Sequence, residues 1–127
     1  MLRVIYLANE KGRKVVGPSY ISSTLRIPKS TAHKMLLKLA ESGFGVYIPK
    51  KGFILNEIGV KEGLKALKKH RLIECLLEEL GISYEHICVE ATKIESFVSQ
   101  ELLRVIEERY RGRRFCPCGK EIPEVEL

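Results

Sequence analysis

The sequence predicts a mainly helical protein with one small β-hairpin: an N-terminal winged helix-turn-helix followed by an all-helical domain. Helical spacing of apolar residues dominates the chain and is interrupted by two short β-prone runs near residue 50. The charge also divides the chain, since residues 1–70 hold 14 Lys and Arg against 4 Glu, whereas residues 71–127 hold 8 against 12. We therefore expect two domains, 1–70 and 71–127.

Three helices are expected before the β-prone runs. The first covers residues 1–9 and ends at the Lys11-Gly12 turn. Pro18 suits a first helical turn and opens a short helix over 18–25, and a break at 26–28 separates it from a helix that ends at Gly43. A short helix, a tight break and a second helix form the helix-turn-helix pattern.

The third helix has an apolar stripe and a basic outer face. Ala32, Leu36 and Leu39 recur at helical spacing, and the runs 46–48 and 53–55 then enclose a basic turn, which completes a winged helix. A basic face in this position favours duplex DNA, with a merely solvated surface as the alternative. The expected DNA-contacting residues are Lys29, Ser30, Thr31, His33, Lys34 and Lys38 on the helix and Lys50 and Lys51 at the hairpin tip.

Three further helices are expected in the rest of the chain. Asn56 can cap a long helix that ends near Gly81. Two shorter helices should follow over 84–98 and 99–110, the last burying Leu102, Leu103 and Ile106.

Composition narrows the class of protein. No apolar run approaches the roughly 20 residues that span a bilayer, and the N-terminus lacks the apolar core of a signal peptide, so we expect a soluble, cytoplasmic protein without a membrane partner. No nucleophile–base pair or phosphate-binding glycine loop is evident, which argues against an enzyme with a small-molecule substrate. In such a chain the four cysteines should be reduced.

Ligand-type side chains gather in the second half. His70 and Glu74 are four residues apart, on one face of a helix, and Cys88 and the Cys116-Pro117-Cys118 loop follow. Imidazole and thiolate ligands in this number indicate a zinc-type site. Alternatives stay open for each: a surface helix pair for His70 and Glu74, a half-buried residue for Cys88 and a redox dithiol for the loop. Cys75 has no partner pattern and is expected in the core.

Several of these segments resemble one known family. The segments are His70-Arg71-Leu72-Ile73-Glu74, Glu90-Ala91, Ile94-Glu95 and Cys116-Pro117-Cys118-Gly119. They resemble the diphtheria-toxin-repressor-like metalloregulators, and most of all their two-domain manganese-transport-regulator branch. The resemblance implies a homodimeric repressor that binds palindromic operators when loaded with a divalent metal.

The resemblance also assigns two metal sites. His70 and Glu74 fall on ligands of the family's ancillary site, Cys88 replaces a histidine there, and Cys118 replaces a histidine of a loop that joins this site in some members. Because both changes exchange imidazole for thiolate, we expect a metal softer than manganese, with zinc first and iron or manganese as the alternatives. At the regulatory site only Glu95 is kept, which leaves that site vestigial.

The sequence thus favours a metal-binding, DNA-binding repressor that acts as a homodimer. An alternative keeps the winged helix but makes the zinc purely structural, with no metal regulation or with regulation by thiol oxidation. A third hypothesis is a winged-helix module that docks on protein, although the basic first half speaks against it.

Overall fold

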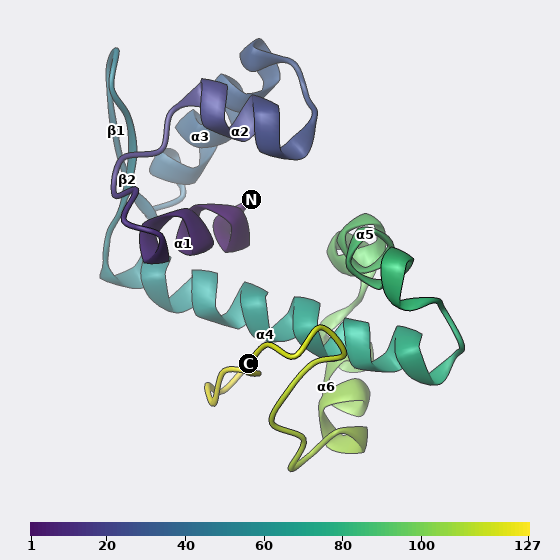
Figure 1. Cartoon of the computed structure of the whole chain (residues 1–127). Helices are drawn as coiled ribbons and strands as arrows, with labels where there is room; N and C mark the ends of the chain where they lie inside the picture. Colours follow the sequence, from purple (N-terminus) through teal and green to yellow (C-terminus); the bar gives the residue numbers. More distant parts are fainter. The chain divides into compact units, whose positions relative to one another are not determined.

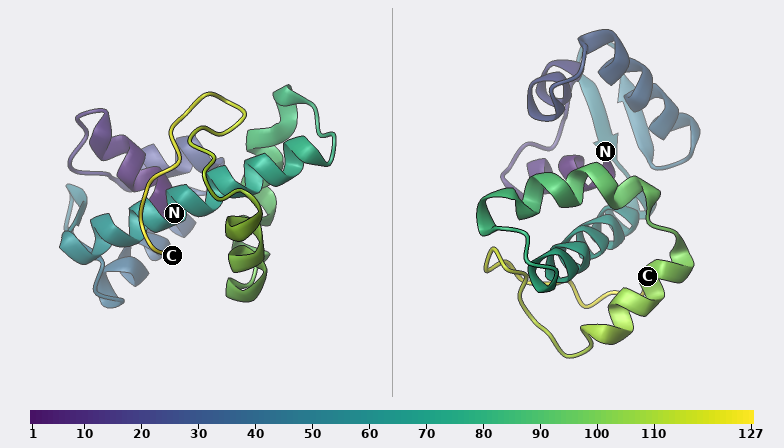
Figure 2. Two further views of the ribbon diagram at one scale, coloured as in Figure 1. Left: turned by 90° about the horizontal axis from the view of Figure 1, so that it is seen from below. Right: turned by 90° about the vertical axis from the view of Figure 1, so that its right-hand side faces the viewer.

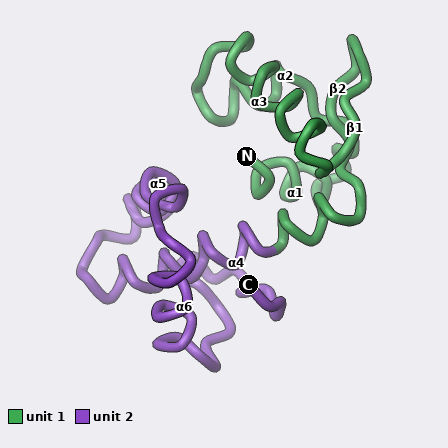
Figure 3. The backbone as a smooth tube through the Cα atoms, turned by 180° about the vertical axis from the view of Figure 1, so that it is seen from behind, with its two compact units in different colours: residues 1–64 green, residues 65–127 purple.

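The computed structural model describes residues 1–127, with six α-helices, one 3-10 turn and one two-stranded sheet (Figure 1). The mainly helical fold with one hairpin is therefore confirmed. In chain order the elements are α1 (Leu2–Glu10), α2 (Pro18–Leu25), α3 (Lys29–Glu41), β1 (Gly45–Ile48), β2 (Gly52–Leu55), α4 (Glu57–Glu79), α5 (Tyr84–Ile94), the 3-10 turn η1 (Glu95–Phe97) and α6 (Gln100–Arg109). The chain forms two compact units, residues 1–64 and 65–127, and the boundary falls within α4 (Figure 3).

The first unit packs its helices and hairpin around one hydrophobic core. Ile5, Ile21, Leu36 and Phe53 come from α1, α2, α3 and β2, and each side chain is fully buried. Burying a side chain of this size stabilises a fold by about 1.5–3 kcal/mol. Since Ala32 is buried as well, one face of α3 is held inward and its opposite face is left at the surface.

A left-handed residue turns the chain between α2 and α3. Arg26 follows α2 with a φ of 56°, and the Ser22 hydroxyl donates to the Ile27 carbonyl oxygen at 2.6 Å. Pro28 then takes the N-cap position of α3 with extended backbone. These local interactions produce the break that separates the two helices of the helix-turn-helix.

The hairpin is tied to the segment before α2. Val16 bridges to Phe53 outside the two strands, and a Cβ on Gly52 would lie 2.7 Å from the Val16 carbonyl oxygen. Gly52 also has a φ of 139°, a conformation open to glycine alone. Gly52 therefore lies directly against the backbone of Val16. The two residues before it, Lys50 and Lys51, are exposed at the hairpin tip.

Asn56 starts the long helix α4, as predicted. Its Oδ1 accepts from the Gly59 backbone N–H at 2.8 Å, and its Nδ2 donates to the Gly43 carbonyl oxygen at 2.9 Å. The same side chain therefore caps α4 and ties it to the end of α3. At 23 residues α4 is the longest helix, yet no helix here is both long and apolar enough to cross a membrane.

In the second unit, α5, α6 and the C-terminal loop surround the last turns of α4 (Figure 2). One buried cluster joins α4, α6 and the loop, and a second joins α4 and α5. Arg71 of α4 donates to the Glu121 carbonyl oxygen, and Lys68 Nζ donates to that of Val125 at 2.7 Å. The loop is thus held against α4 by hydrogen bonds as well as by packing.

Two expectations for this unit were wrong in detail. A continuous helix over 84–98 was predicted, but α5 ends at Ile94, the chain continues as the 3-10 turn, and Val98 is extended directly before Ser99, the N-cap of α6. The Ser99 hydroxyl accepts from the Leu102 N–H at 3.1 Å. Leu102, expected to be buried, is 47% exposed, since Leu103 and Ile106 hold the inward face of α6.

Candidate metal centre and nucleic-acid interface

The metal-ligand candidates begin with two side chains of α4. His70 and Glu74 are 4% and 3% exposed, and they are the buried polar or charged residues of the chain. His70 Nε2 and Glu74 Oε2 are 3.6 Å apart across one helical turn. Burying such groups is costly unless they are paired or coordinate a metal, so a simple surface pair does not describe them.

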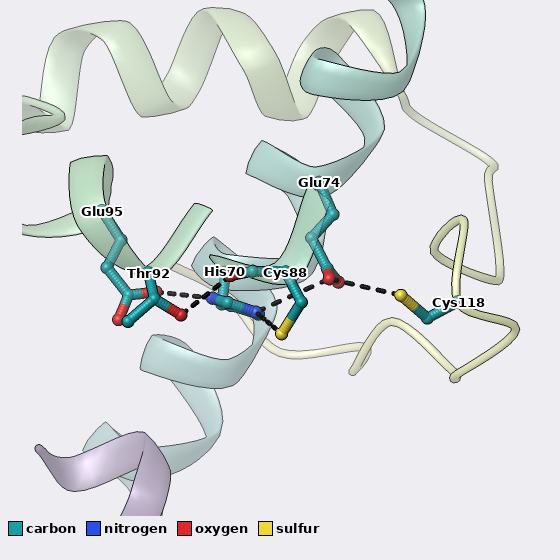
Figure 4. A network of polar contacts seen from close by, with 6 residues as sticks. All are labelled: His70, Glu74, Cys88, Thr92, Glu95 and Cys118. Carbon is teal, nitrogen blue, oxygen red and sulfur yellow. Dashed lines mark hydrogen bonds and ion pairs between the residues drawn. The ribbon is translucent and has the colours of Figure 1, made fainter. Parts of the chain in front are cut away.

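Cys88 lies beside His70, and Cys118 lies beside Glu74 (Figure 4). Cys88 Sγ of α5 lies 3.5 Å from His70 Nε2, and Cys118 Sγ of the C-terminal loop lies 3.5 Å from Glu74 Oε2. The side chains thus come from three segments that are far apart in the sequence. The ligand atoms form two triads, each within 4.8 Å, which share Glu74. One triad adds His70 and Cys88, and the other adds Cys116 and Cys118.

The loop that carries two of these cysteines is a tight hydrogen-bonded turn. Cys116 N donates to the Lys120 carbonyl oxygen at 2.8 Å, and Gly119 N donates to that of Cys116 at 2.9 Å. Gly119 has a φ of 79°, which a residue with a side chain rarely adopts. Cys116 is buried, and its backbone is fixed independently of any ligand.

The donor spacing fits a tetrahedral ion. With ligand bonds of about 2.0–2.3 Å, the donors of a tetrahedral zinc lie roughly 3.3–3.8 Å from one another. The separations His70–Cys88, His70–Glu74 and Glu74–Cys118 are 3.5, 3.6 and 3.5 Å. These three separations match the spacing of neighbouring donors around a tetrahedral ion, and within each triad the ligand atoms lie within 4.8 Å of one another.

The Cys118 thiol lies in surroundings that disfavour its charged form. Burial, reinforced by the Glu74 carboxylate, raises the pKa of Cys118 to about 11. A thiol of this kind is protonated at neutral pH, unlike the reactive thiols of redox dithiols. Cys75 is not a member of either triad. It is fully buried in the cluster with Leu72 and Leu103, as its lack of a partner pattern predicted.

Glu95 occupies a position that sequence reasoning did not predict. Its Oε2 lies 2.6 Å from His70 Nδ1, on the ring edge opposite the triads. Glu95 falls on a ligand of the family's regulatory site by resemblance, yet in this structure it contacts His70, a candidate ligand of the ancillary site. On α5 the Thr92 hydroxyl donates to the Cys88 carbonyl oxygen at 2.9 Å. No local spacing reveals the contact with His70, because 25 residues separate the two side chains.

The predicted DNA-contacting residues lie at the surface of the first unit. All six on α3, from Lys29 to Lys38, are exposed, as are the two lysines of the hairpin tip. The His33 ring packs edge-on against Tyr47 of β1, with 5.2 Å between centroids and 81° between planes. Tyr47 was not among the predicted residues, and it holds His33 next to the hairpin.

Two family models match almost the whole chain. The "Iron dependent repressor, N-terminal DNA binding domain" matches residues 1–53, and the "Iron dependent repressor, metal binding and dimerisation domain" matches residues 56–124. The helix-turn-helix and the first strand of its hairpin fall within the first model, and the cluster around Glu74 falls within the second.

Individual proteins agree with these models. The chain is 30% identical over 116 residues to the uncharacterized HTH-type transcriptional regulator MJ0568 of Methanocaldococcus jannaschii, covering 88% of this chain and 93% of that one. It is 31% identical over 101 residues to the HTH-type transcriptional regulator MntR of Shouchella clausii, covering 80% and 69%. A solved manganese-dependent transcriptional repressor in complex with manganese superposes with a TM-score of 0.84 at 29% identity, over 98% of this chain and 57% of that one.

The resemblance drawn from the His70–Glu74 segment and the cysteine loop is therefore confirmed. The chain belongs to the iron-dependent repressor family of metal-dependent, DNA-binding transcriptional repressors, which bind metal and dimerise through the C-terminal domain.

Proposed function

We propose that this protein is a homodimeric repressor that binds palindromic DNA and holds a zinc-type metal centre in its C-terminal domain. One observation carries the proposal: two triads of imidazole, carboxylate and thiol ligands meet at the buried Glu74. They do so in a chain whose DNA-binding domain exposes a basic helix and a basic hairpin tip.

Five side chains would hold the metal: His70, Glu74, Cys88, Cys116 and Cys118. Three thiols in this set favour zinc over manganese or iron, although regulators that use manganese are among the relatives. A bound divalent ion would supply the charge that keeps these thiols deprotonated. The fold brings three segments together at this site: α4 carries two of the ligands, α5 carries one, and the C-terminal loop carries two.

The two halves would then work as one unit. Two recognition helices of a dimer enter successive major grooves, and the spacing of the half-sites is set by the dimer. Lys34 and its neighbours on α3 meet base edges and phosphates, while Lys50 and Lys51 meet the phosphate backbone. The metal centre fixes the C-terminal loop against α4 and α5, in the domain through which the family dimerises.

A purely structural zinc is the second candidate, and one observation favours it. The two α4 ligands are almost fully buried, and four or five protein donors leave no open position, which is typical of structural sites. Removal of the metal separates the two functions. A regulatory metal changes DNA affinity while the fold persists, whereas loss of a structural metal unfolds the C-terminal domain.

The metal centre is tested by elemental analysis of protein purified without added metal. Wild type should carry roughly one zinc per chain, because a tetrahedral set of this kind binds one ion. Cys116→Ser combined with Cys118→Ser should lose it, and Cys75→Ala is the matched control because that buried cysteine lies outside both triads. Equal metal content in all three proteins would contradict the site.

DNA binding is tested by titrating duplex DNA at several salt concentrations. Lys34→Ala and Lys50→Ala should each weaken binding and reduce the salt slope by about one unit per lost phosphate contact. Lys93→Ala, which removes an equally exposed lysine from α5, should leave both unchanged. A wild type with no affinity for duplex DNA at low salt rules out the repressor and leaves a protein-docking module.

A further inference from the structure

His70 is contacted at both ring nitrogens, and the two contacts differ in kind. Nδ1 lies 2.6 Å from Glu95 Oε2, whereas Nε2 lies 3.5 Å from Cys88 Sγ and 3.6 Å from Glu74 Oε2 (Figure 4). We propose that Glu95 is a positioning residue of the metal centre, which holds His70 so that Nε2 is presented to the ion. This proposal rests on the metal centre proposed above.

The chemistry of the two partners decides which nitrogen carries the proton. An ionised carboxylate accepts hydrogen bonds and donates none, so the short contact with Glu95 requires a proton on His70 Nδ1. A neutral imidazole has only one N–H, which leaves the lone pair of Nε2 directed at Cys88 and Glu74. That is the tautomer that binds a metal through Nε2.

The position of Glu95 prevents it from acting as a further ligand. It lies on the ring edge opposite the one that faces the triads, and neither triad includes it. An ion bound at Nε2 would be separated from this carboxylate by the imidazole ring itself. Glu95 therefore acts on the metal through His70.

Helix α5 and its extension hold both partners of the ring. Cys88 and Glu95 are seven residues apart, about two helical turns, so they lie on the same face. Cys88 reaches the Nε2 edge of His70, and Glu95, the first residue of η1, reaches the Nδ1 edge. Because α5 ends at Ile94, Glu95 begins the 3-10 turn, and its carboxylate contacts the His70 ring there.

The expected effect is on metal affinity. Removing a carboxylate that orients a metal-bound histidine commonly weakens binding by about 10- to 100-fold. Glu95→Ala should weaken zinc binding by this factor. Glu95→Gln should stay within a few-fold of wild type, because an amide oxygen can still accept from Nδ1–H.

The experiment is a competition between the full-length protein and a chromophoric chelator for Zn²⁺. Glu90→Ala is the matched control, since it removes a half-buried carboxylate from α5, the helix directly before η1, and this carboxylate pairs with Lys93. Weak binding by Glu95→Ala alone, restored in Glu95→Gln, supports the proposal. Equal affinities of Glu95→Ala and Glu90→Ala overturn it while leaving the metal centre intact, whereas a wild type that binds no zinc overturns the centre itself.

Two spectra test the role of Glu95 without depending on how the alanine variant folds. Nitrogen NMR of the zinc-loaded wild type should show His70 bound through Nε2 and protonated at Nδ1, and the reverse assignment overturns the proposal. The chain has three histidines, which keeps the spectrum simple. With Co²⁺ in place of zinc, Glu95→Gln should keep the wild-type absorption bands, and bands that report a lost ligand would make Glu95 a ligand instead.

Discussion

At Gly59 in α4, close packing outweighs the low helix propensity of glycine. Replacing an exposed helical glycine with alanine usually stabilises a protein by roughly 0.5–1 kcal/mol. At Gly59, however, the new Cβ would collide with the Phe44 carbonyl oxygen and lie 2.8 Å from Leu55 Cδ2. Overpacking of this kind costs about 1–3 kcal/mol, so the steric term should win.

We therefore predict that Gly59→Ala destabilises the first unit by about 1–2 kcal/mol, as measured by urea unfolding. Lys61→Ala, two residues along the same helix and exposed, is the control and should change stability little. A Gly59→Ala protein that is as stable as wild type, or more stable, would show that the end of α3 can move away from α4.

At the level of elements, α4 and α6 are joined at their ends by an exposed ion pair. Arg109 Nε donates to both Glu79 carboxylate oxygens, at 3.1 and 2.9 Å, and the Tyr110 hydroxyl donates to Oε1 at 3.3 Å. The hydrogen bond from Arg109 lowers the pKa of Glu79 below its ordinary value. A lowered carboxyl pKa contributes stability above the unfolded pKa of about 4.3, and that contribution is lost as the pH falls through the folded pKa.

Glu79→Gln should accordingly be less stable than wild type near neutral pH, and the difference should shrink as the pH falls below about 4.3. Urea unfolding at a series of pH values measures this difference, and added salt should shrink it because the pair is exposed. The control is Glu90→Gln, whose pair with Lys93 lies within one helix. A difference between Glu79→Gln and wild type that stays constant as the pH is lowered from 7 through the acidic range would contradict the electrostatic cause.

On the scale of the whole molecule, the second unit leaves large apolar side chains at its surface. Phe97 is 85% exposed, and several others are more than half exposed or close to it: Leu80, Tyr84, Val89, Leu102 and Val105. The family's C-terminal domain dimerises, and exposed apolar patches are typical of such interfaces. We expect these side chains to be covered by the second copy.

Phe97→Glu should therefore shift the protein from dimer to monomer in analytical ultracentrifugation, since a charge would replace an apolar contact. DNA affinity should fall with it, because a monomer reads only one half-site. Val46→Glu, at an exposed apolar position of the first unit, should leave the dimer intact. An undiminished dimer in Phe97→Glu would place the interface elsewhere.

Many features of the fold could be predicted because their causes are local. Pro18 begins α2 and Asn56 caps α4, each through a feature that reaches no more than three or four residues. The end of α5 was missed, since the chain passes through a 3-10 turn and an extended Val98 before Ser99 caps α6. Leu102 was placed on the wrong face, because apolar character alone does not set the phase of a helix.

The sequence by itself determined which ligand chemistries are present and which helix face is basic, since residue type and helical spacing suffice for both. Only the tertiary structure decided that Glu74 joins the two triads and that Glu95 contacts His70. These are relations between segments up to 44 residues apart. They depend on how α4, α5 and the loop pack, and no local pattern carries that information.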